Sequence, residues 1–335
     1  MRATIESKFP NTPPMREFNV SNDLLGDRAA LEAAWERDGY WFFRDVLERE
    51  AIHRLRAVYL RHLKEAGVVD PASSEAAIYN GASLESYGIG VNHTSPENVA
   101  NDPLFQEHPG KQFVADPAIH KFFRVLIGDE PFWVPLTEYH AVPPKKDHSG
   151  SRFNYIHQDS SNNQGIPFKI CWIPLAPIDE ATGGLAVVEG FHRPQPEDFE
   201  RPGGAPIPES VVPAEAWRRT DYRPGDILIF DMDLPHSGLA NYSDHFFRLS
   251  LDIRFVPASG NVPTVGKVSA VDDGSVTVTD EAGESRRFVL DADTWCRNYD
   301  SLKIPLEKIP AFLAVGSPVV VASEAGRAKV IRPQH

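Results

Sequence analysis

Apolar residues recur every three or four positions in three segments of the first half of the chain. This spacing predicts helices over residues 27–38, 48–66 and 116–127, and a glycine follows each of them. Asp116 is suited to cap the third helix, because its side chain can accept a hydrogen bond from a free backbone N–H. Residues 40–43 are all aromatic and predict a short buried strand after the first helix.

From Phe132 onward the pattern changes to short apolar runs that Pro, Gly and Asp separate. The predicted strands cover residues 132–142, 154–157, 169–174, 185–188, 226–230 and 248–256. Several short strands with turn signals between them indicate a sandwich or a jelly roll. Because the helices precede the strands, we expect the helices to pack on the outside of one sheet.

Shifts in composition divide the chain into three parts. Residues 1–26 are predicted to form an irregular N-terminal arm, and residues 27–258 to form one large domain. Inside that domain, residues 68–110 lack periodicity and are predicted to form a long loop. Residues 259–335 are predicted to form a β-rich C-terminal extension, since the turn at Asp272–Ser275 separates two Val-rich runs. We expect this extension to pack either on the core or on a partner subunit. The second case makes a homodimer a hypothesis.

Composition narrows the range of partners and of compartments. The 335 residues carry a net charge of −13 with no basic stripe, which disfavours a nucleic-acid partner. No apolar run is long enough to cross a membrane, which requires about 18 residues. Only two cysteines occur, Cys171 and Cys296, so a disulfide framework is not expected. A cytoplasmic protein is the resulting expectation.

Three residues from two distant segments are candidates for one metal site. His157 and Asp159 are separated by one residue, so both side chains project from the same face if the segment is a strand. His236 follows the predicted strand 226–230 and is the candidate third ligand. Two imidazoles and one carboxylate can hold one face of Fe(II) and leave the opposite face open. These residues are therefore the predicted metal ligands and catalytic centre.

A charged residue on the last predicted strand adds to this picture. Arg248 and Ser250 alternate there with Leu249 and Leu251, so the polar pair faces one side of the strand. An arginine that points into a barrel is costly unless it has a partner. A dicarboxylate cosubstrate would be that partner, since a guanidinium binds a carboxylate through two parallel hydrogen bonds.

Each of these residues has a plainer interpretation when taken alone. An isolated His-x-Asp pair is more often structural or exposed, and Arg248 alone is more often a surface residue. Their order within a strand-rich region favours the iron site. Two alternatives stay open: a cupin-like metal enzyme without such a cosubstrate, for example an isomerase, and a non-catalytic binding module.

Further motifs resemble those of a known family. Residues 38–47 (DGYWFFRDVL), 172–175 (WIPL), 182–192 (TGGLAVVEGFH) and 224–226 (PGD) are similar to segments of the phytanoyl-CoA dioxygenase family of Fe(II)/2-oxoglutarate-dependent oxygenases. The resemblance covers residues 28–257 and leaves the C-terminal extension outside. It implies a mainly β fold with flanking helices, whose core is a double-stranded β-helix, that is, a cupin-like jelly roll.

The resemblance also implies roles for individual residues. His157, Asp159 and His236 would bind iron, and Arg248 would anchor 2-oxoglutarate with weaker help from Ser250. Trp172 would pack near this cosubstrate, although a purely structural role is an equal alternative.

The implied reaction consumes O₂ and 2-oxoglutarate, releases succinate and CO₂, and hydroxylates an unactivated C–H bond. The carboxylate at Asp159 disfavours halogenation, because related halogenases have a small residue there. Desaturation, epoxidation and ring closure stay open. The polar run Ser160–Gln164 favours a polar small molecule or a natural-product intermediate as the substrate.

Overall fold

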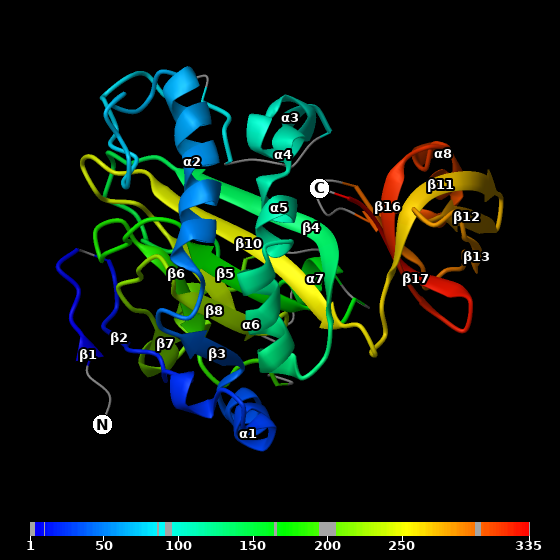
Figure 1. Cartoon of the computed structure of the whole chain (residues 1–335), viewed down its shortest axis with the longest axis horizontal. Helices are drawn as coiled ribbons and strands as arrows, with labels where there is room; N and C mark the ends of the chain where they lie inside the picture. The colour runs from blue at the N-terminus through cyan, green and yellow to red at the C-terminus, as the bar shows by residue number, and fades with distance from the viewer. Residues whose placement is uncertain are drawn as a thin grey trace.

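Two five-stranded sheets form the centre of the molecule in a computed structural model (Figure 1). The structure describes residues 4–9, 11–85, 87–90, 96–163, 166–193, 206–298 and 303–334. One sheet has the order β1 (Thr4–Ile5), β2 (Met15–Arg16), β7 (Trp217–Arg218), β6 (Gly184–Val188) and β9 (His236–Leu239). The other has the order β3 (Tyr40–Phe43), β8 (Ile227–Asp231), β5 (Lys169–Pro174), β10 (Arg248–Pro257) and β4 (Pro131–Val142).

The apolar core between the two sheets follows from the alternation of side chains along each strand. On β5, Ile170 and Trp172 belong to the cluster between the sheets, whereas Cys171 and Ile173 belong to the cluster under the helices. Strands β3, β5 and β8 of this second sheet are buried on both faces, which explains their nearly continuous apolar runs, whereas β10 alternates apolar residues with polar ones. This architecture confirms the mainly β jelly roll with flanking helices that the sequence predicted.

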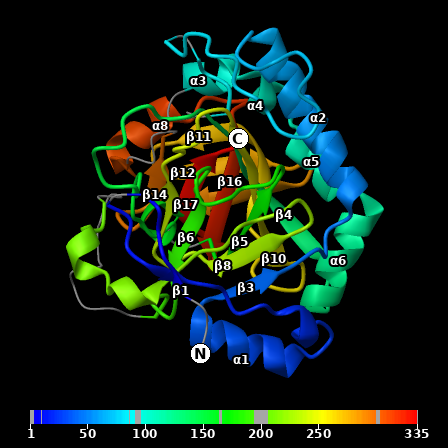
Figure 2. The same ribbon diagram turned by 90° about the vertical axis from the view of Figure 1, so that its left-hand side faces the viewer.

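Helices cover the outer face of the sheet that contains β10, as Figure 2 shows for α2, α5 and α6. Aspartate side chains cap α1 and α6, the cap of α6 as predicted, and glycines with positive φ end both helices. The α-helices are α1 (Arg28–Asp38), α2 (Arg49–Glu65), α3 (Pro96–Asn101), α4 (Pro103–Glu107), α5 (Pro109–Val114), α6 (Pro117–Ile127), α7 (Ser160–Asn163) and α8 (Ile309–Phe312). Short 3₁₀ turns cover Asn22–Leu24, Glu209–Val211, Ala214–Ala216 and Leu306–Lys308.

The prediction of one long loop over residues 68–110 was wrong in its second half. Helices α3, α4 and α5 lie there, and each begins with a proline. Proline suits the first helical position, since its fixed φ is helical and its missing N–H would have no partner there. Residues 86 and 91–95 of this segment lie outside the described residues.

The C-terminal part forms a separate seven-stranded sheet. Its strands are β11 (Thr264–Asp272), β12 (Ser275–Thr279), β13 (Ser285–Val289), β14 (Trp295–Arg297), β15 (Lys303–Ile304), β16 (Pro318–Glu324) and β17 (Arg327–Pro333). A pairing of β13 with β17 closes five of them into a ring, and the predicted hairpin joins β11 to β12. Its β-rich character is as predicted, while the division into three domains stays a prediction.

One apolar cluster joins this C-terminal sheet to the jelly roll. Val320, Ala322 and Val330 belong to the same buried cluster as Leu136 and Phe168 of the jelly roll. Within the residues that the structure describes, no helix is long and apolar enough to cross a membrane. Both cysteines are buried free thiols.

Candidate metal centre

His157 and His236 are direct neighbours across an antiparallel bridge. Their backbones exchange two N–H···O hydrogen bonds of 3.0 and 2.9 Å, and their ring centroids lie 4.3 Å apart. His236 follows β8 as predicted, but it also begins a further strand, β9, that was not predicted. The new strand is what places the second imidazole beside the first.

Both imidazoles are oriented by backbone carbonyls. The Nδ1 atom of His157 lies 3.1 Å from the Tyr155 carbonyl oxygen, and that of His236 lies 2.9 Å from the Leu234 carbonyl oxygen. A carbonyl can only accept, so each Nδ1 carries a proton, and Nε2 is the ring nitrogen left to face Asp159. This outer hydrogen bond is the usual support for a metal-binding histidine.

Asp159 completes the cluster with one carboxylate oxygen. Its Oδ1 lies 3.3 Å from Nε2 of His157 and 3.8 Å from Nε2 of His236. The ligand atoms of all three residues lie within 4.8 Å of one another. Asp159 lies in the turn before α7 and not on a regular strand, so the strand predicted over 154–157 is reduced to isolated bridges. The convergence of the three side chains is nevertheless the one that the sequence predicted.

Arg254 engages the other oxygen of this carboxylate. Its Nη2 donates to Oδ2 of Asp159 over 3.1 Å and to Oε1 of Glu138 over 2.9 Å. Burial alone would raise the pKa of Asp159, but the hydrogen bond with His157 and the charge of Arg254 hold that pKa far below its usual range. Asp159 is therefore a carboxylate with one oxygen, Oδ1, turned to the two histidines.

Burial also keeps His236 in the form that a metal requires. Loss of solvent, with a smaller contribution from nearby His157, lowers the pKa of His236 to about 4. A metal binds only the neutral imidazole, so His236 is ready to bind at neutral pH. The two imidazoles and one carboxylate form a donor set that suits Fe(II).

Arg248 lies on β10 inside the barrel, with 6% of its surface exposed. Its Nη1 donates to the carbonyls of Leu239 over 2.7 Å and of Gly184 over 3.3 Å. Its Nε and the hydroxyl of nearby Ser250 are buried and have no hydrogen-bond partner among the described residues. Buried polar groups normally have a partner, so these two atoms indicate a place for an acceptor such as a carboxylate.

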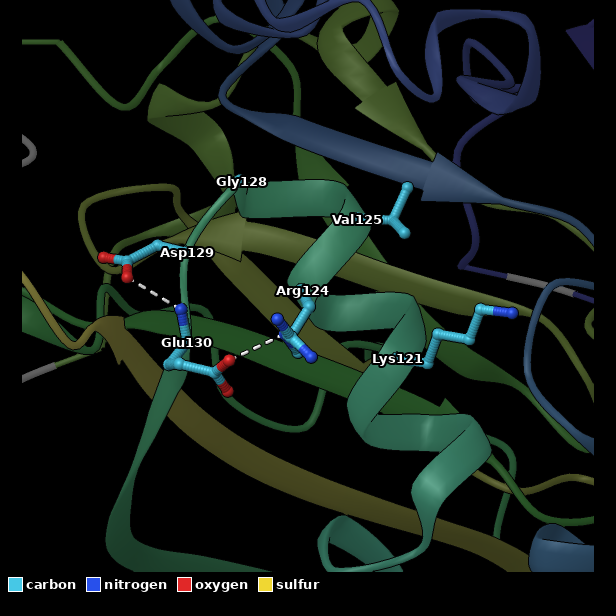
Figure 3. Close-up of a pocket in the computed structure, with 6 residues that line it drawn as sticks. All are labelled: Lys121, Arg124, Val125, Gly128, Asp129 and Glu130. Atoms are coloured by element: carbon cyan, nitrogen blue, oxygen red, sulfur yellow. Dashed lines mark hydrogen bonds and ion pairs between the residues drawn. The ribbon is translucent and has the colours of Figure 1, made fainter.

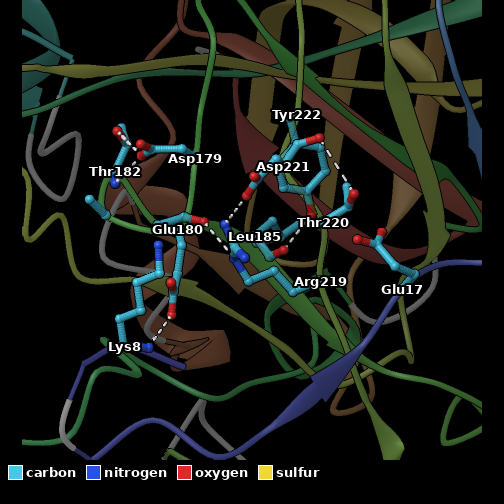
Figure 4. Close-up of polar contacts among 12 residues, drawn as sticks. Lys8, Glu17, Asp179, Glu180, Thr182, Leu185, Arg219, Thr220, Asp221 and Tyr222 are labelled. Atoms are coloured by element: carbon cyan, nitrogen blue, oxygen red, sulfur yellow. Dashed lines mark hydrogen bonds and ion pairs between the residues drawn. The ribbon is translucent and has the colours of Figure 1, made fainter. Parts of the chain in front are cut away.

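Two adjacent glycines make the carbonyl acceptors of Arg248 available. A Cβ on Gly183 would lie 2.8 Å from the Leu239 carbonyl oxygen, and one on Gly184 would lie 2.8 Å from the ring of Tyr222. Figure 4 shows the surrounding contacts, in which Arg219 donates to the Gly183 carbonyl and Tyr222 donates to the Leu185 carbonyl. The Thr-Gly-Gly-Leu motif thus needs both glycines, because the surrounding chain packs too closely there to leave room for a side chain.

Trp172 lies in the apolar core between the sheets. It is 2% exposed, and its ring centroid lies 4.6 Å from that of Tyr222. The position is compatible with both of the predicted roles, core packing and contact with a cosubstrate, so its role stays a prediction.

A second polar group lies on the same inner face, and its members Glu138 and Asp252 were not predicted as site residues. Glu138, His140 and Asp252 place ligand atoms within 4.8 Å of one another, and Glu138 is bonded to Arg254. The signal was present in the alternation of β10, which continues from Arg248 past Ser250 to Asp252 and Arg254.

A surface pocket at the C-terminal end of α6 has none of these features (Figure 3). Its lining residues are Lys121, Arg124, Val125, Gly128, Asp129 and Glu130. Arg124 and Glu130 form an ion pair of 2.7 Å, so the charges there neutralise each other. This pocket shares no residue with the histidine–carboxylate cluster.

A jelly roll with two imidazoles and one carboxylate converging inside defines the class of non-haem iron enzymes. Residues 35–250 match the family described as phytanoyl-CoA dioxygenase (PhyH), and the chain belongs to that family. The protein is accordingly a 2-oxoglutarate-dependent non-haem iron dioxygenase with Fe(II) and 2-oxoglutarate as cofactors.

Two similar proteins share one name. The chain is 28% identical over 265 residues to a 1-deoxypentalenic acid 11-beta-hydroxylase of Streptomyces arenae, with 75% of this chain and 88% of that one covered. The enzyme of the same name from Streptomyces exfoliatus is 26% identical over 266 residues, with the same coverage.

Among solved structures, EctD from S. alaskensis with 2-oxoglutarate and 5-hydroxyectoine has a TM-score of 0.47 and 18% identity, and covers 78% of this chain and 88% of its own. The non-haem alpha-ketoglutarate-dependent carbocyclase SnoK from nogalamycin biosynthesis has a TM-score of 0.45 and 18% identity, and covers 69% of this chain and 84% of its own.

Proposed function

We propose that Fe(II) binds to Nε2 of His157, Nε2 of His236 and Oδ1 of Asp159. The observation that carries this proposal is the orientation of both rings by carbonyl oxygens, which turns Nε2 of both rings toward one carboxylate oxygen. Arg254 supports the carboxylate by occupying its second oxygen. Both Nδ1 atoms stay bonded to backbone carbonyls, so Nε2 is the nitrogen of each ring that would bind the metal.

Arg248 is proposed to bind the distal carboxylate of 2-oxoglutarate, with Ser250 as a second donor. The support is the unpartnered Nε and hydroxyl inside the barrel, which a carboxylate would satisfy. When bound, iron and 2-oxoglutarate supply the O₂-dependent oxidation that yields succinate and CO₂. The chain's own contribution is to orient them, to hold Asp159 ionised and to exclude water from a buried site.

The proposed reaction is hydroxylation of an unactivated C–H bond in a polar small molecule or a natural-product intermediate. Support comes from the hydroxylase names of the two relatives and from the polar inner face formed by Glu138, His140 and Asp252. Tyr155, which is 37% exposed beside His157, is proposed as part of the entrance. A cytoplasmic location, a homodimer and the absence of a nucleic-acid partner stay predictions.

One residue of the polar run after Asp159, Asn163, points into the protein. Asn163 is buried and bonded inside the protein, so solvent or substrate contact is not the reason for its polarity. Gln164 lies outside the described residues.

The test is anaerobic addition of Fe(II) and 2-oxoglutarate to metal-free protein, followed by the visible charge-transfer band of the chelate. We expect a band in the wild type, none in His236→Ala and a weakened one in Arg248→Ala. Arg124→Ala, which removes a surface arginine, is the matched control and should leave the band unchanged. A folded wild-type protein without a band would contradict the proposal.

A further inference from the structure

The helix that follows Asp159 is held by two arginines of the C-terminal sheet. Arg297 of β14 donates to the Ser161 carbonyl over 2.6 Å, and Arg332 of β17 donates to the side-chain oxygen of Asn163. The Asn163 amide in turn donates to the Asp159 carbonyl over 2.9 Å. A chain of hydrogen bonds therefore runs from the C-terminal sheet to the backbone of a proposed iron ligand.

The guanidinium groups of both arginines are buried, and the loss of their hydration is unfavourable in free energy. Arg297 is fully buried and Arg332 is 6% exposed, and burial lowers the pKa of each to about 10. The charged groups with the largest effect on the pKa of Arg332 are Arg254, Glu138 and Asp159. A buried charge persists only where its hydrogen bonds offset its desolvation, so this arrangement demands defined geometry at α7.

The sheet that carries these arginines is fixed to the jelly roll. Val320, Ala322 and Val330 of β16 and β17 share a buried cluster with Leu136 of β4. Figure 1 shows the C-terminal sheet at one end of the jelly roll, on the side where α7 lies. The contact between Arg332 and Asn163 is therefore built on a continuous apolar base.

We propose that the C-terminal sheet is a component of the iron site, although it lies outside the matched family segment. Arg332 and Arg297 are positioning residues: Arg297 holds α7 at Ser161, and Arg332, through Asn163, holds the backbone of Asp159 so that its Oδ1 faces the histidines. This inference rests on the proposed role of Asp159 as a metal ligand. It predicts that a change in the last strand alters metal binding in the jelly roll.

The test is a Co(II) titration of full-length variants that records both the dissociation constant and the visible spectrum of the bound ion. We expect Arg332→Met and Asn163→Leu each to weaken Co(II) binding by about 10-fold or more and to change the spectrum, as loss of an outer-shell partner does. The double variant should be no worse than either single one, because both remove one link. Arg332→Lys should restore part of the affinity.

Arg327→Met is the matched control on the same strand, since Arg327 forms an exposed ion pair with Asp291. It should bind Co(II) like the wild type. If Arg332→Met does not fold, Asn163→Leu breaks the same link from the jelly-roll side and decides the question. Wild-type affinity and spectrum in folded variants would overturn the inference, even with a lowered melting temperature. If His236→Ala binds Co(II) as tightly as the wild type, the proposed function itself is overturned.

Discussion

At the scale of single residues, the position of the Arg248 guanidinium depends on the absence of a side chain at Gly238 as well as on its hydrogen-bond partners. Gly238 on β9 lies against the guanidinium, and a Cβ there would stand 3.3 Å from Nη2 and 3.6 Å from Nη1. The carbonyls of Gly184 and Leu239 already hold Nη1. The guanidinium cannot move away from a new methyl group without weakening these hydrogen bonds.

Gly238→Ala is therefore expected to weaken 2-oxoglutarate binding about 10-fold, which corresponds to about 1.4 kcal/mol of crowding. Metal binding should be unchanged, because the histidine–carboxylate cluster is not touched. Titration of the Fe(II) protein with 2-oxoglutarate measures the effect. Gly274→Ala is the control, since a Cβ there meets no atom within 4 Å. Equal affinity in both variants would remove the proposed role of this contact.

Residue patterns predicted the convergence of His157, Asp159 and His236, because residue type and order carry that information. They did not reveal Arg254 or Asn163 as partners of Asp159. The contact of Arg254 with Asp159 spans 95 residues, and the acceptor of Arg332 on Asn163 lies 169 residues away. Such pairs depend on how separate elements pack, which a one-dimensional pattern does not contain.

At the scale of elements, β5 meets α1 through an ammonium group buried against aromatic rings. Nζ of Lys169 lies 3.2 Å from the centroid of the Trp35 ring and 5.1 Å from that of Trp41. Burial lowers the pKa of Lys169 to about 8, and the charge of Asp231 offsets only part of this effect. Folding therefore disfavours the protonated form of this side chain.

The sign of the resulting pH dependence follows directly. Between about pH 8 and about pH 10.4 the unfolded chain keeps a proton on Lys169 that the folded protein loses, so this residue makes stability rise with pH there. Below about pH 8 its penalty is constant, at about 3 kcal/mol before the cation–π attraction of about 1–2 kcal/mol is counted.

Lys169→Met should thus raise the free energy of unfolding at pH 7 by about 1 kcal/mol and remove this rise with pH. Urea denaturation from pH 7 to pH 10 measures both. Lys303→Met is the control, because it removes an exposed ammonium group that lies over the Trp295 ring and so tests the loss of such a ring contact alone. A rise with pH that persists unchanged in Lys169→Met would refute the assignment.

Elements with local signals were predictable, and those without them were not. Each of these signals lies within its own element: Asp27 and Asp116 directly precede the helices that they cap, and the alternation runs along β10 itself. Strand β9 was missed because His236–Leu239 is short and contains a serine and a glycine, which do not mark a strand. Its pairing with β6 and its bridge to His157 make it a strand.

At the scale of the whole molecule, the C-terminal sheet covers part of the jelly-roll core. A chain cut after residue 258 would lose Val320, Ala322 and Val330 from the shared cluster and expose Leu136 and Phe168. We expect this shortened chain to aggregate or to melt at least 10 °C lower, since several buried apolar side chains are uncovered at about 1.5–3 kcal/mol each.

Light scattering and thermal melting of the shortened and the full chain measure this outcome. They also test the alternative that the extension serves a homodimer. A shortened chain that stays soluble, melts within a few degrees of the full chain and loses only its dimeric state would favour that alternative over packing on the core. The sequence left both open, because the β-rich pattern of residues 259–335 does not say which surface the sheet covers.

The separation between Arg332 and Asn163 also has a consequence for the timing of synthesis. At about 5–20 residues per second, a ribosome needs about 10–30 s to add the 169 positions between them. During this interval the nascent chain already carries Asp159 without the arginine that holds its backbone. With the role proposed for Arg332, the arrival of the C-terminal sheet, and not the appearance of the ligands, decides when the newborn enzyme binds iron at full affinity.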